Sequence, residues 1–227
     1  MAAGAGAQYQ RHDAVAHFAA HELEPQKNSL CASERQEPAR EEFRRAAGQT
    51  DAPRFVFVDE SGSHTSMTPL YGWAPRSERA VESVPKNRGK NTTIIGALSW
   101  LGVQAAMTVE GAANTAAFEV FVEQVLCPSL QPGQIVVLDN LSIHKSARVR
   151  ELIENRDCEL WFLPTYSPDL NPIEHAWSKL KAFLRQQQAR TAQTLQQTIA
   201  LGLPLITSKD AQAWFRHCRY QPIRQPH

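Results

Sequence analysis

Three acidic residues have the types and positions that metal-assisted phosphate chemistry requires. Asp59 and Asp139 each follow four apolar residues, FVFV at 55–58 and IVVL at 135–138, and Glu174 lies early in a predicted helix. Such runs are typical of strands buried on both faces, and the carboxyl edge of such a sheet is where ligands bind. Carboxylate oxygens are the ligands that Mg²⁺ and Mn²⁺ prefer. We therefore predict that the three acids form a divalent metal site that acts on phosphate groups.

Each acid also has a simpler structural explanation when it is taken alone. An aspartate after a strand commonly caps the next turn, and this is the better explanation for Asp59 or Asp139 by itself. Glu174 lies three residues after Asn171 and two after Pro172, which is the pattern of a capping box at a helix start. Capping does not require two buried strands to end in the same residue type, whereas a shared cation does. The combined pattern favours the metal site.

Polar and basic residues near the acids are candidates for holding a phosphate backbone. They are Asn140, His144 and Lys145, which follow Asp139, and Lys181 and Arg185, which lie seven and eleven positions after Glu174. The two helix cations project on a similar side to Glu174 and would grip phosphates that flank the reacting one. A solvated helix face explains Lys181 and Arg185 equally well. His144 equally fits a loop histidine with satisfied hydrogen bonds, and we do not assign it as a general base.

The elements that must position these residues can be predicted from the apolar pattern. We predict strands at 54–59, 70–73, 92–101, 104–109, 135–139 and 159–163, and helices at 115–126, 147–155, 194–201 and 209–218, with a further helix starting at Asn171. Residues 92–109 should form a hairpin and residues 60–63 a turn. Strands followed by helices in this order indicate an α/β fold, a mixed β-sheet flanked by helices.

A chain of 227 residues is long enough for one well-filled core and an appendage. Residues 1–53 lack the β-branched runs seen later, and we predict a helical and linker segment there, part of it without fixed structure, with a charged helix at 37–47. The main domain is predicted at 54–220 and a tail at 221–227. The four cysteines, Cys31, Cys127, Cys158 and Cys218, form no CxxC pair, so reduced and packed thiols are expected.

Charge is unevenly distributed along the chain. Residues 1–139 hold 12 Lys and Arg against 16 Asp and Glu, a balance of −4, and residues 140–227 hold 12 against 7, a balance of +5. A basic second half fits a polyanionic partner, although a solvated surface explains the count nearly as well. The chain has neither a signal-peptide pattern nor a good membrane span, so we expect a cytoplasmic protein.

Longer motifs around the acids resemble a known family. The sequence VLDN at 137–140 with His144, and LPTYSPDLNPIE at 163–174 with Trp177, closely resemble the catalytic core of transposases of the bacterial insertion-sequence group related to Tc1/mariner elements. Asp139 and Glu174 are 174 − 139 = 35 positions apart, so 34 residues intervene, as the acidic triad of that group requires. FVDESG at 57–62 and YGWAPR at 71–76, which ends in Arg76, resemble its first-aspartate region. The similarity covers about residues 54–220.

This resemblance implies an RNase H-like fold and cut-and-paste DNA transposition. It implies that Asp59, Asp139 and Glu174 are catalytic and hold two Mg²⁺ or Mn²⁺ ions, and that Arg76 is a further candidate DNA contact. The partners it implies are double-stranded DNA, namely the transposon ends and the target, and a second copy of the chain in a homodimer. Insertion at TA dinucleotides is also typical of the family.

The resemblance does not extend to the start of the chain. Full-length relatives carry N-terminal helix-turn-helix domains, and residues 1–50 contain no comparable pair of helices, so a separate helix-turn-helix polypeptide is one expected partner. Two alternatives remain open. One is a general RNase H-like nuclease, which would not need the string at 166–172. The other is a catalytically silent DNA-binding or interaction protein from a decayed element.

Overall fold

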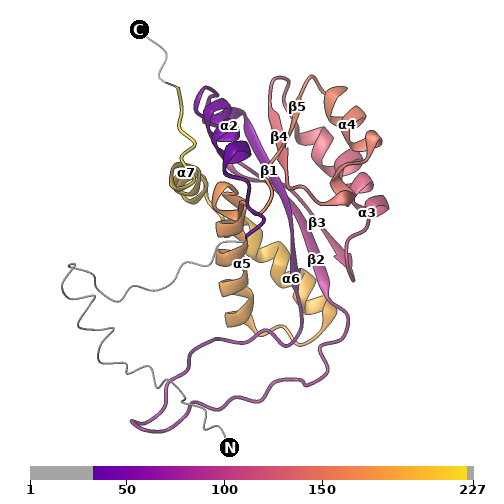
Figure 1. Cartoon of the computed structure of the whole chain (residues 1–227). Coiled ribbons are helices and arrows are strands. Elements are labelled where there is room, and N and C mark those ends of the chain that lie inside the picture. Colours follow the sequence, from indigo (N-terminus) through magenta and orange to yellow (C-terminus); the bar gives the residue numbers. More distant parts are fainter. Residues whose placement is uncertain (1–32, 224–227) are drawn as a thin grey trace, which may run out of the picture. The chain divides into compact units, whose positions relative to one another are not determined.

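The computed structural model describes residues 33–223, and the predictions for residues 1–32 lie outside this part of the chain (Figure 1). Residues 34–223 belong to one compact unit. Cys127, Cys158 and Cys218 are buried and free within it, as predicted. None of the helices in the described part is both long and apolar enough to span a membrane.

A five-stranded mixed sheet forms the centre of this unit. Its strands are β1 (Phe55–Ser63), β2 (Thr92–Ser99), β3 (Gly102–Glu110), β4 (Ile135–Leu138) and β5 (Glu159–Phe162), in the spatial order β3-β2-β1-β4-β5. Strands β1, β2 and β3 pair antiparallel, whereas β4 is parallel to both β1 and β5. The mixed sheet predicted from the sequence is therefore confirmed, and so is the hairpin now formed by β2 and β3.

Helices cover both faces of the sheet (Figure 1). One face carries α2 (Glu37–Gly48), α5 (Ile173–Gln187), α6 (Ala192–Gly202) and α7 (Ser208–His217), and the other carries α3 (Thr115–Phe121), which continues into η2 (Val122–Leu126), and α4 (Ala147–Glu154). The remaining short turns of helix are η1 (Ala52–Arg54), η3 (Cys127–Ser129), η4 (Ser142–His144), η5 (Pro168–Leu170) and η6 (Leu203–Leu205). Each face has its own apolar core.

Alternation along β1 explains the two cores. Successive side chains of a strand point to opposite faces. Phe55 and Phe57 pack with the α2, α5 and α7 side, while Val56 and Val58 pack with the α3 and α4 side. All four are almost completely inaccessible to solvent. The predicted burial of this strand on both faces is therefore confirmed.

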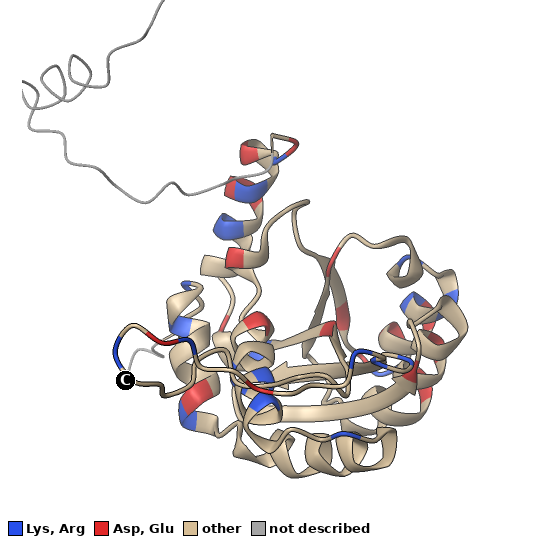
Figure 2. Cartoon of the chain, turned by 90° about the horizontal axis from the view of Figure 1, so that it is seen from below, with Lys and Arg blue, Asp and Glu red and all other residues tan. Residues whose placement is uncertain are grey.

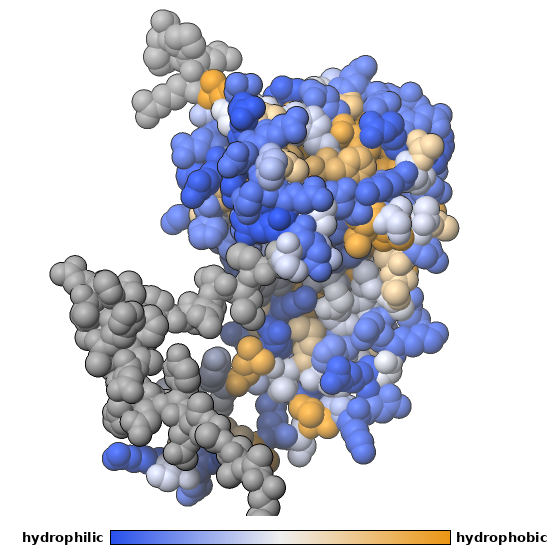
Figure 3. Space-filling view, viewed as in Figure 1, coloured by the Kyte–Doolittle hydropathy of each residue, from blue (hydrophilic) through white to orange (hydrophobic). Residues whose placement is uncertain are grey.

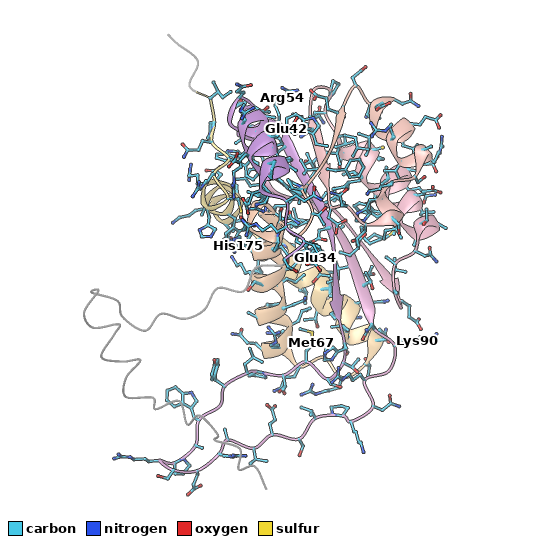
Figure 4. All side chains as sticks on the ribbon, in the orientation of Figure 1. Glu34, Glu42, Arg54, Met67, Lys90 and His175 are labelled. Atoms are coloured by element: carbon cyan, nitrogen blue, oxygen red, sulfur yellow. The ribbon has the colours of Figure 1, made fainter. Side chains whose placement is uncertain are left out.

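Two local predictions around β1 are wrong. The predicted turn at 60–63 is strand, because β1 continues to pair with β2 as far as Ser63 opposite Thr92. The predicted strand at 70–73 is absent, because residues 64–91 leave the sheet as a long excursion whose apolar side chains find no partner strand. Trp73 is fully exposed there. Figure 4 labels Met67 and Lys90 near the two ends of this excursion, and Figure 3 shows that the surface in this view is mostly hydrophilic.

Helix α2 packs on the same core as the sheet. The sequence predicts a helix at 37–47 within a segment that precedes a domain starting at residue 54. In the structure Phe43 and Ala47 of α2 join the core that contains Phe55, and the ring of Phe43 lies edge-on to Trp161 at 6.1 Å. The compact unit thus includes residues that lie before the predicted boundary.

Candidate active site

The register of β1 and β4 brings two of the predicted acids to the same edge of the sheet. These strands are parallel neighbours, and their pairing runs from Phe55 opposite Ile135 to Phe57 opposite Val137. Asp59 and Asp139 each lie two residues beyond the last pair, so both emerge at the carboxyl edge at the same level. This edge is where open α/β sheets bind ligands.

Glu174 approaches the same edge from the start of α5. The capping box that offered a simpler explanation for Glu174 is not formed. The helix begins at Ile173 with Pro172 as its N-cap, and among the described residues its first turn has no side-chain cap hydrogen bond. The carboxylate of Glu174 is exposed. Figure 4 labels its neighbour His175 at this end of α5.

One pocket of about 310 Å³ contains all three acids. Its lining comprises Asp59, Asp139, Asn140, Leu141, residues 163–168, Asn171 and Glu174. The wall opposite the sheet is therefore made by the segment between β5 and α5. A pocket of this size accommodates small ions and a phosphate group, and its floor is acidic.

Asp59 occupies an environment that disfavours its negative charge. Burial raises the pKa of Asp59 to about 7; a hydrogen bond from the Glu60 N–H opposes this shift, and the charges of Glu174 and Asp139 add to it. Its Oδ1 accepts the Glu60 N–H at 2.8 Å, and its Oδ2 accepts the indole N–H of Trp177 at 3.2 Å. A cation in the pocket would favour the ionised form.

Asp139 is held by His144, which lies in η4. Nδ1 of His144 is 2.6 Å from Oδ1 of Asp139, and its Nε2 is 2.8 Å from Oε1 of Glu60. Burial alone would lower the pKa of His144, but these hydrogen bonds outweigh burial and raise it to about 9. Burial acts to raise the pKa of Asp139, yet the hydrogen bond to His144 outweighs it and keeps that pKa below its usual value. Asp139 is therefore an ionised acceptor at neutral pH.

Comparison with known proteins identifies the family. The family model described as "DDE superfamily endonuclease" matches residues 54–196, which is more than half of the chain and includes all three acids. The chain belongs to the DDE superfamily endonucleases.

Two curated relatives of this DDE endonuclease are nematode proteins. The Tcb2 transposase of Caenorhabditis briggsae is 26% identical over 156 residues, which cover 64% of this chain and 57% of that protein. The Tc1 transposase of Caenorhabditis elegans is 35% identical over 75 residues, or 33% of this chain and 28% of that protein. The chain thus spans just over half of the length of the first relative.

Solved structures share the fold of this DDE endonuclease. The Mos1 transposase paired-end complex with left transposon end matches with a TM-score of 0.69 at 18% identity, covering 91% of this chain and 67% of that one. A crystal structure of the Mos1 mariner transposase catalytic domain matches with a TM-score of 0.58 at 14% identity, covering 84% and 92%. The predicted RNase H-like fold is confirmed by these matches.

The pocket of the DDE endonuclease fits an open metal site rather than a closed one. Within residues 33–223 no group of three His, Cys, Asp or Glu side chains is already gathered as a cation cage. The donor set nevertheless suits a hard divalent cation, because three carboxylates share one pocket and their mutual repulsion contributes to the raised pKa of Asp59. Asp59, Asp139 and Glu174 are the residues that could hold such an ion. Their oxygens would have to draw closer around it.

The residues predicted to contact a phosphate backbone lie in different places. Asn140 lines the pocket, and its Nδ2 donates to the Leu163 carbonyl at 2.5 Å. Lys145 is exposed and lines a different cavity, and Lys181 and Arg185 are half-buried on α5 and do not line the acidic pocket. Arg76 is exposed in the excursion at 64–91, also outside the lining. Figure 2 shows Lys and Arg distributed over several helices and loops rather than gathered in one patch.

His144 does not face the pocket. It is completely buried, and both ring nitrogens are engaged by carboxylates, so its ring offers no hydrogen-bond donor to DNA in this structure. Its ring packs 4.3 Å from that of Phe118. Of the two explanations that the sequence allowed for His144, the geometry matches the loop histidine whose hydrogen bonds are satisfied.

The pocket wall explains why the string at 166–172 has such specific residues. Asp169 accepts two hydrogen bonds from the buried guanidinium of Arg40 in α2, at 3.1 and 2.6 Å. Leu170 packs in the core, and its carbonyl accepts the Tyr220 hydroxyl at 2.7 Å. Tyr166 has a positive φ of 53°. The conformation of this loop is thus fixed by its contacts with Arg40 of α2 and with Tyr220, which follows α7.

Sequence reasoning missed two residues that touch the acids. Glu60 is predicted from the sequence to lie in a turn, and Trp177 enters as part of the family motif, without a polar role. The signal for Glu60 was its position directly after Asp59 in a strand. Because successive side chains of a strand point to opposite faces of the sheet, Glu60 can support the site from the face opposite to Asp59. The indole N–H of a buried Trp generally needs an acceptor, which was the signal for Trp177.

Proposed function

We propose that this chain is the catalytic part of a DDE transposase, which cleaves DNA at the ends of a mobile element and joins them to a target. The observation that carries the proposal is the convergence of Asp59, Asp139 and Glu174 on one pocket from two parallel strands and a helix start. Family membership and the 34-residue gap between the last two acids support it.

In this proposal, the three carboxylates bind two Mg²⁺ or Mn²⁺ ions. When bound, these ions supply activation of a water or 3′-hydroxyl nucleophile and stabilisation of the leaving oxygen in an in-line displacement. The role of the chain itself is positioning and charge. Asp139 is kept ionised by His144, and Asn140 fixes the segment at Leu163 that begins the pocket wall. Lys145, Lys181, Arg185 and Arg76 contact phosphates away from the scissile one.

The proposed partners are double-stranded DNA and further protein. The named Mos1 complexes contain a transposon end, and we infer the same class of ligand, element ends and target, for this chain. A homodimer would bring two ends together, and a helix-turn-helix polypeptide would add end recognition. We further propose that the chain belongs to the bacterial insertion-sequence branch and works in the cytoplasm, where the DNA of such an element lies.

A cleavage assay tests the proposal. The purified chain is incubated with Mn²⁺ or Mg²⁺ and a duplex that carries the terminal repeats flanking its coding region, beside a scrambled duplex and an RNA–DNA hybrid. Asp139→Asn should abolish nicking at the repeat boundary. The matched control is Asp157→Asn, at an exposed turn residue with a φ of 55° that asparagine tolerates.

The outcomes separate the alternatives. Metal-dependent nicking at the repeat boundary that Asp139→Asn removes and Asp157→Asn leaves intact supports the transposase. Preference for the RNA–DNA hybrid indicates a general nuclease, whereas equal cleavage of the two duplexes indicates that end recognition comes from another polypeptide. Cleavage that survives Asp139→Asn contradicts the site assignment, and a complete lack of cleavage with both metals indicates a silent protein.

A further inference from the structure

The backbone pairing that aligns β1 with β4 stops before the acids. The last parallel pair is Phe57 with Val137, so Asp59 and Asp139 lie beyond the ladder. On its other side β1 stays paired with β2, with Asp59 opposite Gly96 and Glu60 opposite Ile95. The segment of β1 that carries Asp59 and Glu60 is therefore held by β2. The residues after β4, which include Asp139, have no backbone pairing with β1, so another connection must fix the distance between Asp139 and β1.

A side-chain bridge supplies that connection. Glu60 is adjacent to Asp59 in the strand but points to the opposite face, where its Oε1 meets Nε2 of His144 at 2.8 Å. The other ring nitrogen of His144 meets Asp139 at 2.6 Å. The bridge thus runs from β1 through one imidazole to the end of β4, and it replaces the missing backbone pairs.

The bridge is rigid because its centre is buried. The side chain of His144 is 0% exposed and that of Glu60 is 13% exposed. The ring of Phe118 packs 4.3 Å from the imidazole, and the short η4 turn fixes the backbone of His144. Ordinary surface ion pairs lack such confinement. The buried bridge can therefore fix the distance between Glu60 and Asp139.

The bridge also selects which oxygen of Asp139 faces the pocket. Oδ1 accepts from Nδ1 of His144 and from the Leu141 N–H at 2.9 Å. Within the described part of the chain no hydrogen bond reaches Oδ2. Asp139 thus has one oxygen committed to the protein and one left for a ligand in the pocket. A carboxylate oriented in this way is suited to bind a cation through a single oxygen.

We propose that Glu60 and His144 are positioning residues that set the separation of Asp59 and Asp139 and present Oδ2 of Asp139 to a divalent cation. The proposal rests on the metal-dependent function proposed above and adds two residues to it. Neither residue touches DNA or the reacting atoms. Their side chains act on the metal site by holding Asp139 against β1.

Manganese binding to the full chain without DNA is the direct test. Binding is measured by electron paramagnetic resonance of free Mn²⁺ for the wild type and for Asp139→Ala, His144→Phe, His144→Asn, Glu60→Ala and Glu60→Gln. Loss of a group that orients a metal ligand typically weakens metal affinity about 10–100-fold. His144→Phe and Glu60→Ala should show such a loss.

The conservative variants separate positioning from mere stability. An asparagine at 144 can still donate its amide N–H towards Asp139, and a glutamine at 60 can still accept from His144. Glu60→Gln should therefore bind Mn²⁺ within about threefold of the wild type, well inside the 10–100-fold loss. His144→Asn keeps the donor to Asp139 but loses the contact with Glu60, so its affinity should fall as it does in Glu60→Ala. Circular dichroism and melting are recorded for every variant. A purely structural role would lower the melting temperature while the folded protein kept its Mn²⁺ affinity, and that result overturns the proposal.

The two proposals fail in different ways. Wild-type protein that binds no Mn²⁺, or Asp139→Ala that binds like the wild type, removes the metal site and with it the role of the bridge. Wild-type binding that depends on Asp139 but not on His144→Phe or Glu60→Ala overturns the bridge and leaves the metal site standing. If His144→Phe does not fold, the comparison of Glu60→Ala with Glu60→Gln decides, and equal affinities overturn the bridge.

Discussion

Replacing Asp169 by alanine is expected to lower the free energy of unfolding more than replacing its partner Arg40 by methionine. The guanidinium of Arg40 is 0% exposed, whereas the side chain of Asp169 is 50% exposed. The Asp169→Ala protein would therefore keep a buried positive charge that has lost two hydrogen bonds. Arg44 and Arg35 lie 3.7 and 3.9 Å from the same Oδ2 and would lose this counter-charge, while both keep Glu37 as an ion-pair partner.

The expected magnitude follows from the exposure of the pair. Removing one partner of a fully buried ion pair costs about 3–5 kcal/mol. Asp169 is half exposed, and Glu37 remains 3.5 Å from Nε of Arg40, so we expect about 2 kcal/mol for Asp169→Ala, which lies below that range. In Arg40→Met the freed Asp169 can be hydrated and the apolar side chain fills the space, so about 1 kcal/mol or less is expected.

Urea unfolding followed by circular dichroism measures both variants, with Arg45→Met on the exposed side of α2 as the control. For a domain of this size about 2 kcal/mol corresponds to a melting temperature lower by about 4–8 °C. The double variant should cost less than the sum of the two, since the contact is lost once. An Arg40→Met protein that is as unstable as Asp169→Ala, or more so, would refute the reasoning.

The packing, a helix cap and the pocket each give another test. In Gly96→Ala the new Cβ would lie 2.6 Å from the Trp177 ring, so unfolding in urea should show a loss of about 1–3 kcal/mol; a wild-type midpoint would contradict this. Asp210 completes the capping box of α7 by accepting the N–H of the N-cap residue Thr207, and its hydrogen bond from Lys179 is the main reason that its pKa falls from 3.8 to about 2. Asp210→Ala should lower the free energy of unfolding by about 1 kcal/mol at pH 7. Because the pKa of Asp210 is lower in the folded than in the unfolded protein, its ionised form stabilises the fold above about pH 4, and this contribution is lost as pH falls from about 4 through about 2. A difference between wild type and variant that stays constant over this pH range would contradict the prediction. Mn²⁺ at a hundredfold excess over its Kd should stabilise the wild type by about 2.7 kcal/mol, reversibly with EDTA, and Asp59→Asn should not respond.

The apolar pattern predicted most of the fold because the core positions repeat with clear periods. The runs before Asp59 and Asp139 become β1 and β4, and the hairpin at 92–109 becomes β2 and β3. The strand predicted at 70–73 failed for a physical reason. Aromatic and apolar residues favour a strand only where a neighbouring strand and a core receive them. Leu70, Tyr71 and Trp73 are exposed and pair with no strand of the described sheet.

The acids of the pocket could be predicted from the sequence, but the side-chain contacts that hold the pocket in place could not. Asp59, Asp139 and Glu174 are signalled by their place at the ends of elements, which a sequence shows directly. The contact of Arg40 with Asp169 joins residues 129 positions apart, and no periodicity reports such a pairing. The same holds for Glu60 and His144, which are 84 positions apart. Side-chain pairing across the fold depends on register and packing, which appear only in three dimensions.

Asp59 and Glu174 are linked to each other through a glycine and a tryptophan. Gly96 of β2 lies opposite Asp59, and its lack of a side chain lets the Trp177 ring lie against the strand. From that position the indole N–H reaches Oδ2 of Asp59 at 3.2 Å. Trp177 is three residues after Glu174 on α5, so the two share one side of the helix. The contact that orients Asp59 therefore also fixes how close Glu174 comes to it, and a change at Gly96 should disturb both acids together.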